Sequence, residues 1–302
     1  MRPSNARIRS TTEGGSLDRS PAPVPRLSRI PRFVLVPRSG TPSAVGTCTL
    51  SFLTETATWL LLLDCTTDTA IQVPDGITLD GNGHKITAVE PGIGHFTGAV
   101  VQNATAQSTI HVTNLTVDAT LPGNPCDAGE QRLRGILFFG ASGTATNNHV
   151  TVTQGVNFGC QEGNAIEARN FVGETLSSPD RTSVTISDNV IPLYQKTGIL
   201  ANGNVDAIVT RNVVTGVGPS TLIAQNGVQM GFGATGLISA NEISGNNYTP
   251  NSFFACGIIV VDADGVDRKQ QDNLFPPNTD PMANEKDTCG FAKGGNYDPF
   301  GN

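Results

Sequence analysis

Glu167 and Arg169 are the residues of this chain whose types and spacing are best suited to chemistry. They stand two positions apart in the segment NAIEARN, residues 164–170, so an extended backbone projects both from one face. A carboxyl group can transfer a proton, and a guanidinium can hold a carboxylate through two hydrogen bonds. The catalytic hypothesis is that Glu167 acts as acid or base while Arg169 orients an acidic sugar. The alternative is an ion pair on a solvated face, which contributes less than about 1 kcal/mol.

The elements that must position this pair belong to a repeat, which is clearest in residues 197–274. Its copies open on a glycine followed by Ile or Val, at Gly198, Gly227 and Gly257, so the period is 29 and then 30 residues. Within each copy, apolar and polar residues alternate between Gly and Asn, and this predicts short strands rather than helices. A period of this length predicts a β-solenoid, because propeller blades need about 40 to 50 residues.

The alternation also predicts which side chains point outward. With Ile or Val inward, the alternate positions of each opening strand face solvent, and successive coils stack them about 4.8 Å apart. The resulting strip contains Leu137 and Phe139, Glu167 and Arg169, Leu200 and Asn202, Gln229 and Gly231, and Ile259 and Val261. We expect Glu167 and Arg169 to be catalytic. The predicted substrate-binding residues beside them are Arg134, Glu162, Asn202 and Gln229.

Asparagines recur at one predicted corner of the repeat. They are Asn148, Asn189, Asn212, Asn241 and Asn273. Aligned polar groups at a buried corner must bond to one another and to the backbone. We therefore interpret them as a structural ladder of amides, not as ligands. On the inward face we expect Ile199, Ala201, Ile208 and Val213.

Six cysteines without metal-ligand spacing favour disulfides and an oxidising compartment. Pairing by position joins Cys48 to Cys65, Cys126 to Cys160 and Cys256 to Cys289. The first pair brackets the earliest candidate strands and is placed to close the end of a solenoid, which otherwise exposes an apolar cross-section. The alternative is six buried thiols in a cytosolic protein.

The segment IQVPDGITLDGNGHKITA, residues 71–88, resembles the opening coil of secreted proteins of the pectin-lyase-like superfamily. The resemblance continues through the repeats to about residue 275 and implies a right-handed parallel β-helix of about seven or eight coils. This superfamily includes polysaccharide lyases, polygalacturonases, uronan epimerases, tailspikes and adhesins, so the fold alone does not identify a function. The superfamily's usual catalytic motifs are absent here. The nearest fragment, GIGH at residues 92–95, lacks the Asp-Asp partner of polygalacturonases.

Charge is distributed unevenly along the 302 residues, whose net charge is −7. Residues 1–47 contain eight arginines and two acidic residues (+6), and the remaining 11 basic and 24 acidic residues give −13. We predict a disordered Arg/Pro/Ser-rich tail over residues 1–46 and a β-helix domain over residues 47–302, with an N-terminal cap and an irregular C-terminal segment. A transit peptide and a misassigned start codon are the alternatives for the tail. The acidic body argues against a nucleic-acid partner.

The remaining expectations concern partners and cofactors. The longest apolar run in the tail, residues 33–36, is too short for a secretory signal, and no segment is long enough to span a membrane. The segment 262–267 (DADGVD) resembles a calcium loop only weakly, and the four His are scattered, so we expect no metal or other cofactor. Cysteines and fold suggest a secreted or cell-surface monomer that associates with a polysaccharide or cell-wall glycan. It is either an enzyme that cleaves or modifies the glycan or a non-catalytic adhesin or binding module.

Overall fold

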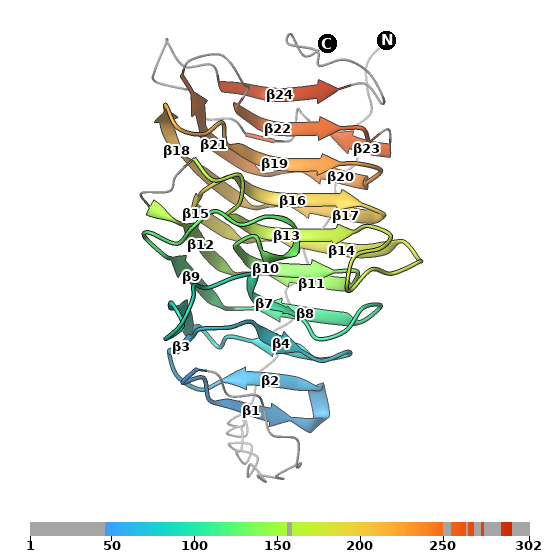
Figure 1. Cartoon of the computed structure of the whole chain (residues 1–302). Helices are drawn as coiled ribbons and strands as arrows, with labels where there is room; N and C mark the ends of the chain where they lie inside the picture. Colours follow the sequence, from blue (N-terminus) through green and yellow to red (C-terminus); the bar gives the residue numbers. More distant parts are fainter. Residues whose placement is uncertain are drawn as a thin grey trace, which may run out of the picture. The chain divides into compact units, whose positions relative to one another are not determined.

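A computed structural model describes residues 46–155, 159–249, 255–263, 265–268, 273–274 and 285–291. The chain winds as a right-handed parallel β-helix, in which each coil adds one strand to each of three sheets (Figure 1). We name the sheets A, B and C. The eight stacked strands of sheet C agree with the predicted seven or eight coils.

Sheet A contains β1 (Leu50–Leu53), β2 (Thr58–Leu61), β5 (Thr78–Asp80), β8 (Thr109–Thr113), β11 (Ser142–Thr146), β14 (Thr182–Ser187), β17 (Val205–Thr210), β20 (Thr235–Ser239) and β23 (Gly265–Arg268). Sheet B contains β3 (Cys65–Thr67), β6 (Lys85–Ala88), β9 (Thr116–Thr120), β12 (His149–Thr153), β15 (Val190–Tyr194), β18 (Val213–Ser220) and β21 (Glu242–Tyr248). Sheet C contains β4 (Ile71–Val73), β7 (Ala99–Asn103), β10 (Arg134–Phe139), β13 (Asn164–Asn170), β16 (Thr197–Gly203), β19 (Asn226–Gly231), β22 (Ala255–Val261) and β24 (Glu285–Phe291).

The predicted repeat is confirmed by the register of sheet C. Ile199 pairs with Val228, which pairs in turn with Ile258, and all three are fully buried. Aliphatic side chains from all three sheets fill the interior of the coil. Parallel strands buried on their inner face need this repeated match of apolar residues, because a slip of one residue would turn the set outward.

The predicted inward face is wrong at two positions. Ile208 is 42% exposed and Val213 is 37% exposed, whereas their neighbours Val209 and Val214 are fully buried. The corner between β16 and β17 and the corner that holds Asn212 each change the phase of the alternation. A period of two therefore holds within a strand but not across a corner.

The predicted asparagine ladder is confirmed at the corner between sheets A and B. Each Nδ2 donates to the Oδ1 of the next coil, at 3.0 Å from Asn148 to Asn189, 2.9 Å to Asn212, 2.9 Å to Asn241 and 3.0 Å to Asn273. The backbone N–H of each donor asparagine bonds to the same Oδ1. The ladder thus satisfies polar groups that are buried at every turn of the coil.

The N-terminal end of the coil is closed by an antiparallel hairpin, β1–β2, around the short 3-10 helix η1 (Thr54–Thr56). A disulfide joins Cys48 to Cys65 there, and a second joins Cys126 to Cys160, as predicted. The third predicted pair includes Cys289, whose side chain lies outside the described residues. The predicted tail, apart from Gly46, also lies outside them. No helix in the described segments of the chain has the length and apolarity to cross a membrane.

Candidate functional site

The structure brings the residues of the predicted strip into register on the outer face of sheet C. Glu167 lies between Leu137 and Leu200 on the neighbouring strands. Arg169 lies between Phe139 and Asn202 in the next row. Gln229 and Ile259 continue the first row on β19 and β22. The stacking that was predicted from the repeat is therefore correct.

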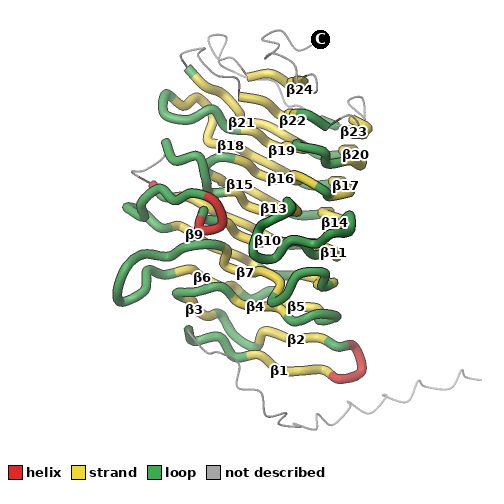
Figure 2. The backbone as a smooth tube through the Cα atoms, turned by 45° about the vertical axis from the view of Figure 1, so that its right-hand side comes forward, coloured by secondary structure: helices red, strands yellow, loops and turns green. Residues whose placement is uncertain are grey.

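The expectation that this strip faces solvent is wrong for at least half of its residues. Glu167 is 1% exposed, and Leu137, Phe139, Leu200 and Ile259 are also buried. Arg134 and Glu162, which were predicted beside the strip, are fully buried. Two connections fold over this region of sheet C, and both are insertions relative to the short corners of the later coils. We call them the η2 loop (residues 121–133, with the 3-10 helix η2, Gly129–Gln131) and the insertion loop (residues 171–181). Figure 2 shows the insertion loop, between β13 and β14, lying over β10.

Packing and hydrogen bonds hold the two loops in place. Leu176 of the insertion loop packs on an apolar patch formed by Ala99, Leu137 and Phe139. The backbone N–H of Thr175 donates to Oε1 of Glu130 in η2 at 2.9 Å, which joins the two loops. The side-chain hydroxyl of Thr175 and this backbone hydrogen bond together lower the pKa of Glu130. Alternation along a strand predicts the outward direction of a side chain but not a loop that later covers it.

Beneath these loops, both oxygens of Glu167 are occupied. Its Oε2 accepts from Nε of Arg134 at 2.6 Å and from Nδ2 of Asn164 at 2.8 Å. Its Oε1 accepts from Nη1 of Arg169 at 3.1 Å. Burial by itself raises the pKa of this carboxyl, but the two guanidinium groups and the hydrogen bonds outweigh burial, and the pKa lies below its ordinary value. Glu167 is therefore an ionised, fully paired carboxylate.

Arg134 and Glu162 anchor the η2 loop from below. The guanidinium of Arg134 donates to the carbonyl oxygens of Gly129 at 3.0 Å, Glu130 at 3.1 Å and Arg132 at 2.6 Å. The carboxylate of Glu162 accepts from the backbone N–H groups of Asp127 at 2.5 Å and Leu133 at 2.7 Å, and from Nε2 of Gln154 at 3.0 Å. Every one of these contacts is to the protein itself. The geometry gives both residues a structural role.

Arg169 marks the boundary between the covered and the open regions of the strip. Its guanidinium carbon lies 5.6 Å from the ring centroids of both Phe139 and Phe171. Its Nε donates to Glu174 of the insertion loop at 3.1 Å, and a second contact joins Nη2 to the same carboxylate. The positive charge of Arg169 is thus balanced by Glu167 and Glu174, and its side chain remains 13% exposed.

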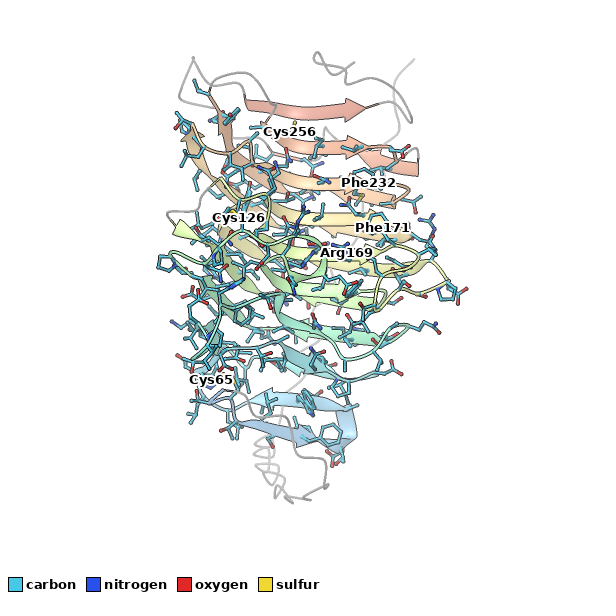
Figure 3. The ribbon with its side chains drawn as sticks, in the orientation of Figure 1. Cys65, Cys126, Arg169, Phe171, Phe232 and Cys256 are labelled. Atoms are coloured by element: carbon cyan, nitrogen blue, oxygen red, sulfur yellow. A yellow bond between two sulfur atoms is a disulfide. The ribbon has the colours of Figure 1, made fainter. Side chains whose placement is uncertain are left out.

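Beyond Arg169, the outer face of sheet C carries half-buried amides beside two aromatic rings, whereas Leu200 and Ile259 on the same face are buried. Nε2 of Gln229 donates to Oδ1 of Asn202 at 3.4 Å, and both side chains are half-buried. The rings of Phe171 and Phe232 lie 6.3 Å apart at a 57° tilt, and Phe232 is 50% exposed. Figure 3 labels Arg169, Phe171 and Phe232 at this edge of the stack. We call Phe171, Asn202, Gln229 and Phe232 the open patch.

The backbone at Phe232 has the left-handed conformation that this corner also has in the neighbouring coils, at Gly203 (φ +82°) and Asp262 (φ +49°). Its φ is +56°, in the left-handed region that bulky residues rarely adopt. The neighbouring Gly231 leaves room for the Asn202 amide, because a Cβ at Gly231 would lie only 2.8 Å from Oδ1 of Asn202. The sequence signal that could have revealed the patch is an aromatic residue after the strand at two corners, in NFVG (170–173) and GFG (231–233).

A second buried ladder of amides also escaped prediction. Gln154 and Gln195 exchange hydrogen bonds, with the N–H of Gln154 donating to Oε1 of Gln195 at 2.8 Å. Gln154 also donates to Oδ1 of Asn124 at 2.9 Å, and Gln225 donates to the backbone of Gln195 at 3.1 Å. The glutamines are 41 and 30 residues apart in the sequence, which matches the coil spacing and could have revealed the ladder.

Two other features have the residue types of a site. A shallow groove of about 360 Å³ runs along the outside of the asparagine corner, where Asn147, His149 and Asp188 line it, and Asp188 is paired with Arg211. Among the described residues, Cys126, Cys160 and Glu162 form the cluster with metal-ligand types, but the two sulfurs are joined in a disulfide. The DADGVD segment contains Asp264, which lies outside the described residues, so its weak resemblance to a calcium loop stays a prediction.

Comparison with known proteins does not assign this chain to a family. No protein-family model matches the chain, and neither curated proteins nor solved structures give a significant match. The three stacked parallel sheets establish the parallel β-helix on their own.

Proposed function

We propose that this chain is a secreted or cell-surface β-helix protein of the pectin-lyase-like type, and that it binds a neutral carbohydrate at the open patch without cleaving it. One observation carries the proposal. The carboxylate that was best placed for catalysis, Glu167, is buried and has both oxygens occupied, whereas the amides of the open patch are half-buried and the ring of Phe232 beside them is exposed. The patch therefore has groups for recognition but no proton donor.

The chemistry of the open patch suits a sugar ring. An aromatic side chain offers a flat apolar face, and Phe171 and Phe232 present two such faces at an angle to each other. The amides of Asn202 and Gln229 each contain donors and an acceptor, which matches the paired donor and acceptor character of vicinal hydroxyls. Pockets for small ligands commonly combine an apolar lining with a few placed polar groups.

Charge favours a neutral glycan over a uronate. Arg169 lies beside Phe171, and two carboxylates already balance its charge. The chain after residue 47 has a net charge of −13 from its 11 basic and 24 acidic residues. An acidic polysaccharide would meet this field with Arg181, which is exposed and hydrogen-bonded to the carbonyl of Gly233 beside Phe232, as the cation that partly offsets it.

Catalysis of the glycosidase type requires two carboxyl groups, one of them able to donate a proton. Glu167 and Glu174 are close in space, but the same guanidinium bridges them. The lowered pKa of Glu167 keeps it ionised at neutral pH. A binding module therefore fits the geometry better than the alternative of a lyase, hydrolase or epimerase.

The two disulfides support the proposed location. Disulfides persist in secreted and cell-surface proteins and are rare where glutathione keeps thiols reduced. Cys48–Cys65 closes the N-terminal hairpin, and Cys126–Cys160 ties the η2 loop to the following coil. Both cross-links would be lost in a reducing cytosol.

The experiment is a glycan array with the full chain, followed by calorimetric titration of the best ligand. We expect Phe232→Ala to weaken binding about tenfold or more, which corresponds to about 1.4 kcal/mol. The matched control is Phe52→Ala, because Phe52 is similarly exposed (44%) but lies on β1 at the capped end. Equal affinities of the two variants would remove the open patch as the site.

The same ligands should be incubated with the protein and assayed for new reducing ends and for unsaturated products. No product is expected. If a product forms and Glu167→Gln abolishes it, the chain is an enzyme and the non-catalytic assignment is wrong.

A further inference from the structure

The outer face of sheet A carries a grid of small hydroxyl side chains, on a different face from the open patch. Three consecutive strands, β8, β11 and β14, each present three outward residues. They are Thr109, His111 and Thr113; Ser142, Thr144 and Thr146; and Ser183, Thr185 and Ser187. Eight of these nine residues are Ser or Thr, and none is acidic, Lys or Arg. All except Ser187 are half-buried or exposed.

The grid is regular because the three strands pair without a register shift. Ser142 pairs with Thr109 and Thr146 with Thr113, and on the other side Thr144 pairs with Thr185. Sheet B differs, because its register shifts between β12 and β15 and again between β18 and β21. Neighbouring strands in a sheet lie about 4.8 Å apart, and every second residue along a strand is about 6.7 Å away. The backbone positions of the outward residues therefore form a rectangular lattice, within which Nδ1 of His111 lies 2.9 Å from Oγ1 of Thr144 and Oγ of Ser142 accepts from the N–H of Ser183 at 3.1 Å.

Several features fix this lattice before any ligand arrives. The alternate residues Ile110, Val112 and Ala145 are fully buried, which holds the strands in one orientation. Thr is branched at Cβ and has a restricted χ1, so its hydroxyl and methyl keep defined positions. Oγ1 of Thr146 donates to Oγ1 of Thr113 at 3.2 Å, so two rows are linked directly. Preorganisation of this kind lowers the entropic cost of binding.

The row that contains Thr144 and Thr185 continues onto β17 and β20 with apolar side chains and contains no charged residue from β11 to β20. Thr185 pairs with Ile208, and Ile208 pairs with Leu237 on β20. Ile208 is 42% exposed and Leu237 is half-buried. The row thus presents the methyls of Thr144 and Thr185 and then two aliphatic side chains. Asp80 and Asp206 lie on the strands that border the grid.

The residue types of the grid indicate which ligands the outer face of sheet A can bind. The grid has no Lys or Arg to hold phosphate or carboxylate groups, and His111, which contacts Thr144, is its one ring, so it offers little stacking surface for sugar rings. Its strands are paired on both sides, so they offer no edge to an extended peptide. What remains is a preordered array of hydroxyls and methyls around His111. Hydroxyls hold first-layer waters by hydrogen bonds, and methyls restrict the orientation of the waters between them.

We propose that the outer face of sheet A binds ice. Both spacings of the grid are close to repeats between water oxygens on faces of hexagonal ice, so waters ordered on the grid can join the crystal lattice. This function is independent of the carbohydrate proposal, because it uses another sheet and none of the residues of the open patch.

The test uses the full chain with its disulfides formed, and measures inhibition of ice recrystallisation together with the fraction of protein taken into a slowly grown ice hemisphere. We expect the unmodified protein to be active in both assays. Thr144→Tyr, which places a ring at the centre of the grid, should reduce the activity at least tenfold. Thr151→Tyr is the matched control, because Thr151 is a half-buried outward residue of β12 in sheet B, and it should be as active as the unmodified protein.

Circular dichroism and thermal unfolding establish that both variants are folded. If Thr144→Tyr is misfolded, Thr185→Ala, which removes a hydroxyl and a methyl without adding bulk, takes its place and should also reduce the activity. Three results would overturn the proposal: no activity of the unmodified protein, equal activity of grid and control variants, or retention on crystalline cellulose or chitin through Thr144 in place of ice. Phe232→Ala should leave ice activity unchanged.

Discussion

Glu167 accepts a hydrogen bond from Nη1 of Arg169 at 3.1 Å in a position that two loops cover. The two residues were predicted to act together on a substrate, and they do contact each other. The contact belongs to a chain of charges from Arg134 through Glu167 and Arg169 to Glu174, and this chain binds the insertion loop to sheet C. The network stabilises the coil and limits the accessible surface to the residues beyond Arg169.

Removal of the central charge of this network should be costly. Glu167→Gln leaves two guanidinium groups without their shared carboxylate in a buried site, so we expect a loss of about 3 to 5 kcal/mol in the free energy of unfolding. Denaturant titration followed by circular dichroism measures it. Glu242→Gln, at an exposed position of β21, is the control and should change stability by less than about 0.5 kcal/mol. A loss below about 1 kcal/mol at Glu167 would mean that the network is not buried in solution.

The same network should make the free energy of unfolding depend on pH in the acidic range. The pKa of Glu167 is lower in the folded chain than its ordinary value of 4.5. A carboxyl with a depressed folded pKa contributes its full stability above the unfolded pKa and loses it as the pH falls through the folded value. The difference in stability between the unmodified protein and Glu167→Gln should therefore be constant above about pH 5 and shrink below about pH 4.5. A difference that does not vary with pH would contradict this assignment.

Lys196 should make the stability of the folded chain depend on pH in the alkaline range. Its Nζ donates to the carbonyl of Ala224 at 2.7 Å, and burial lowers its pKa from 10.5 to about 8. Between these values the unfolded chain binds the proton more tightly, so stability rises with pH. Relative to Lys196→Met, the unmodified protein should gain up to about 3 kcal/mol between about pH 8 and pH 10.5, at about 1.36 kcal/mol per pH unit. Thermal unfolding of both proteins across this range tests it, and parallel curves would refute it.

The asparagine ladder should be cooperative. Asn212 donates to Asn241 and accepts from Asn189, and both partners are buried. Asn212→Ala leaves those groups without a partner, and each buried unsatisfied group costs about 1 to 3 kcal/mol. We expect a total loss of about 3 kcal/mol or more in chemical denaturation, against less than about 0.5 kcal/mol for Thr215→Ala on the outer face of β18. Similar losses for the two variants would show that the ladder is not a structural element.

The two disulfides should differ in how much they contribute to the free energy of unfolding. Cys48 and Cys65 are 17 residues apart, and Cys126 and Cys160 are 34 apart. On the chain-entropy model, these loops correspond to about 3 and about 4 kcal/mol of stabilisation, respectively. Replacement of each pair by Ser, followed by calorimetry, should therefore lower the midpoint of unfolding more for the second pair. Loss of Cys126–Cys160 should also speed proteolysis in the η2 loop, whereas loss of Cys48–Cys65 should not.

The sequence determined the architecture because each coil repeats the same local requirements. Glycine with Ile or Val at positions 198, 227 and 257, asparagine at each corner and alternation in between are properties of one turn of the coil, and stacking follows from their repetition. The asparagine ladder was predictable for the same reason, because its partners lie one coil apart. Cys126 and Cys160 are also about one coil apart, at 34 residues, whereas Cys48 and Cys65 are 17 residues apart and were paired because they bracket the first strands.

Only the tertiary structure decided which outward residues are open. Glu167 and Gln229 occupy equivalent positions on β13 and β19, yet one is buried and the other is half-exposed. The difference arises from the η2 loop and the insertion loop, whose paths depend on contacts such as Leu176 on Leu137 that are far apart in the chain. Periodicity specifies the direction of a side chain from the backbone, whereas exposure depends on what packs above it. For that reason the strip was predictable from the sequence, whereas its accessible region, which begins beyond Arg169, was not.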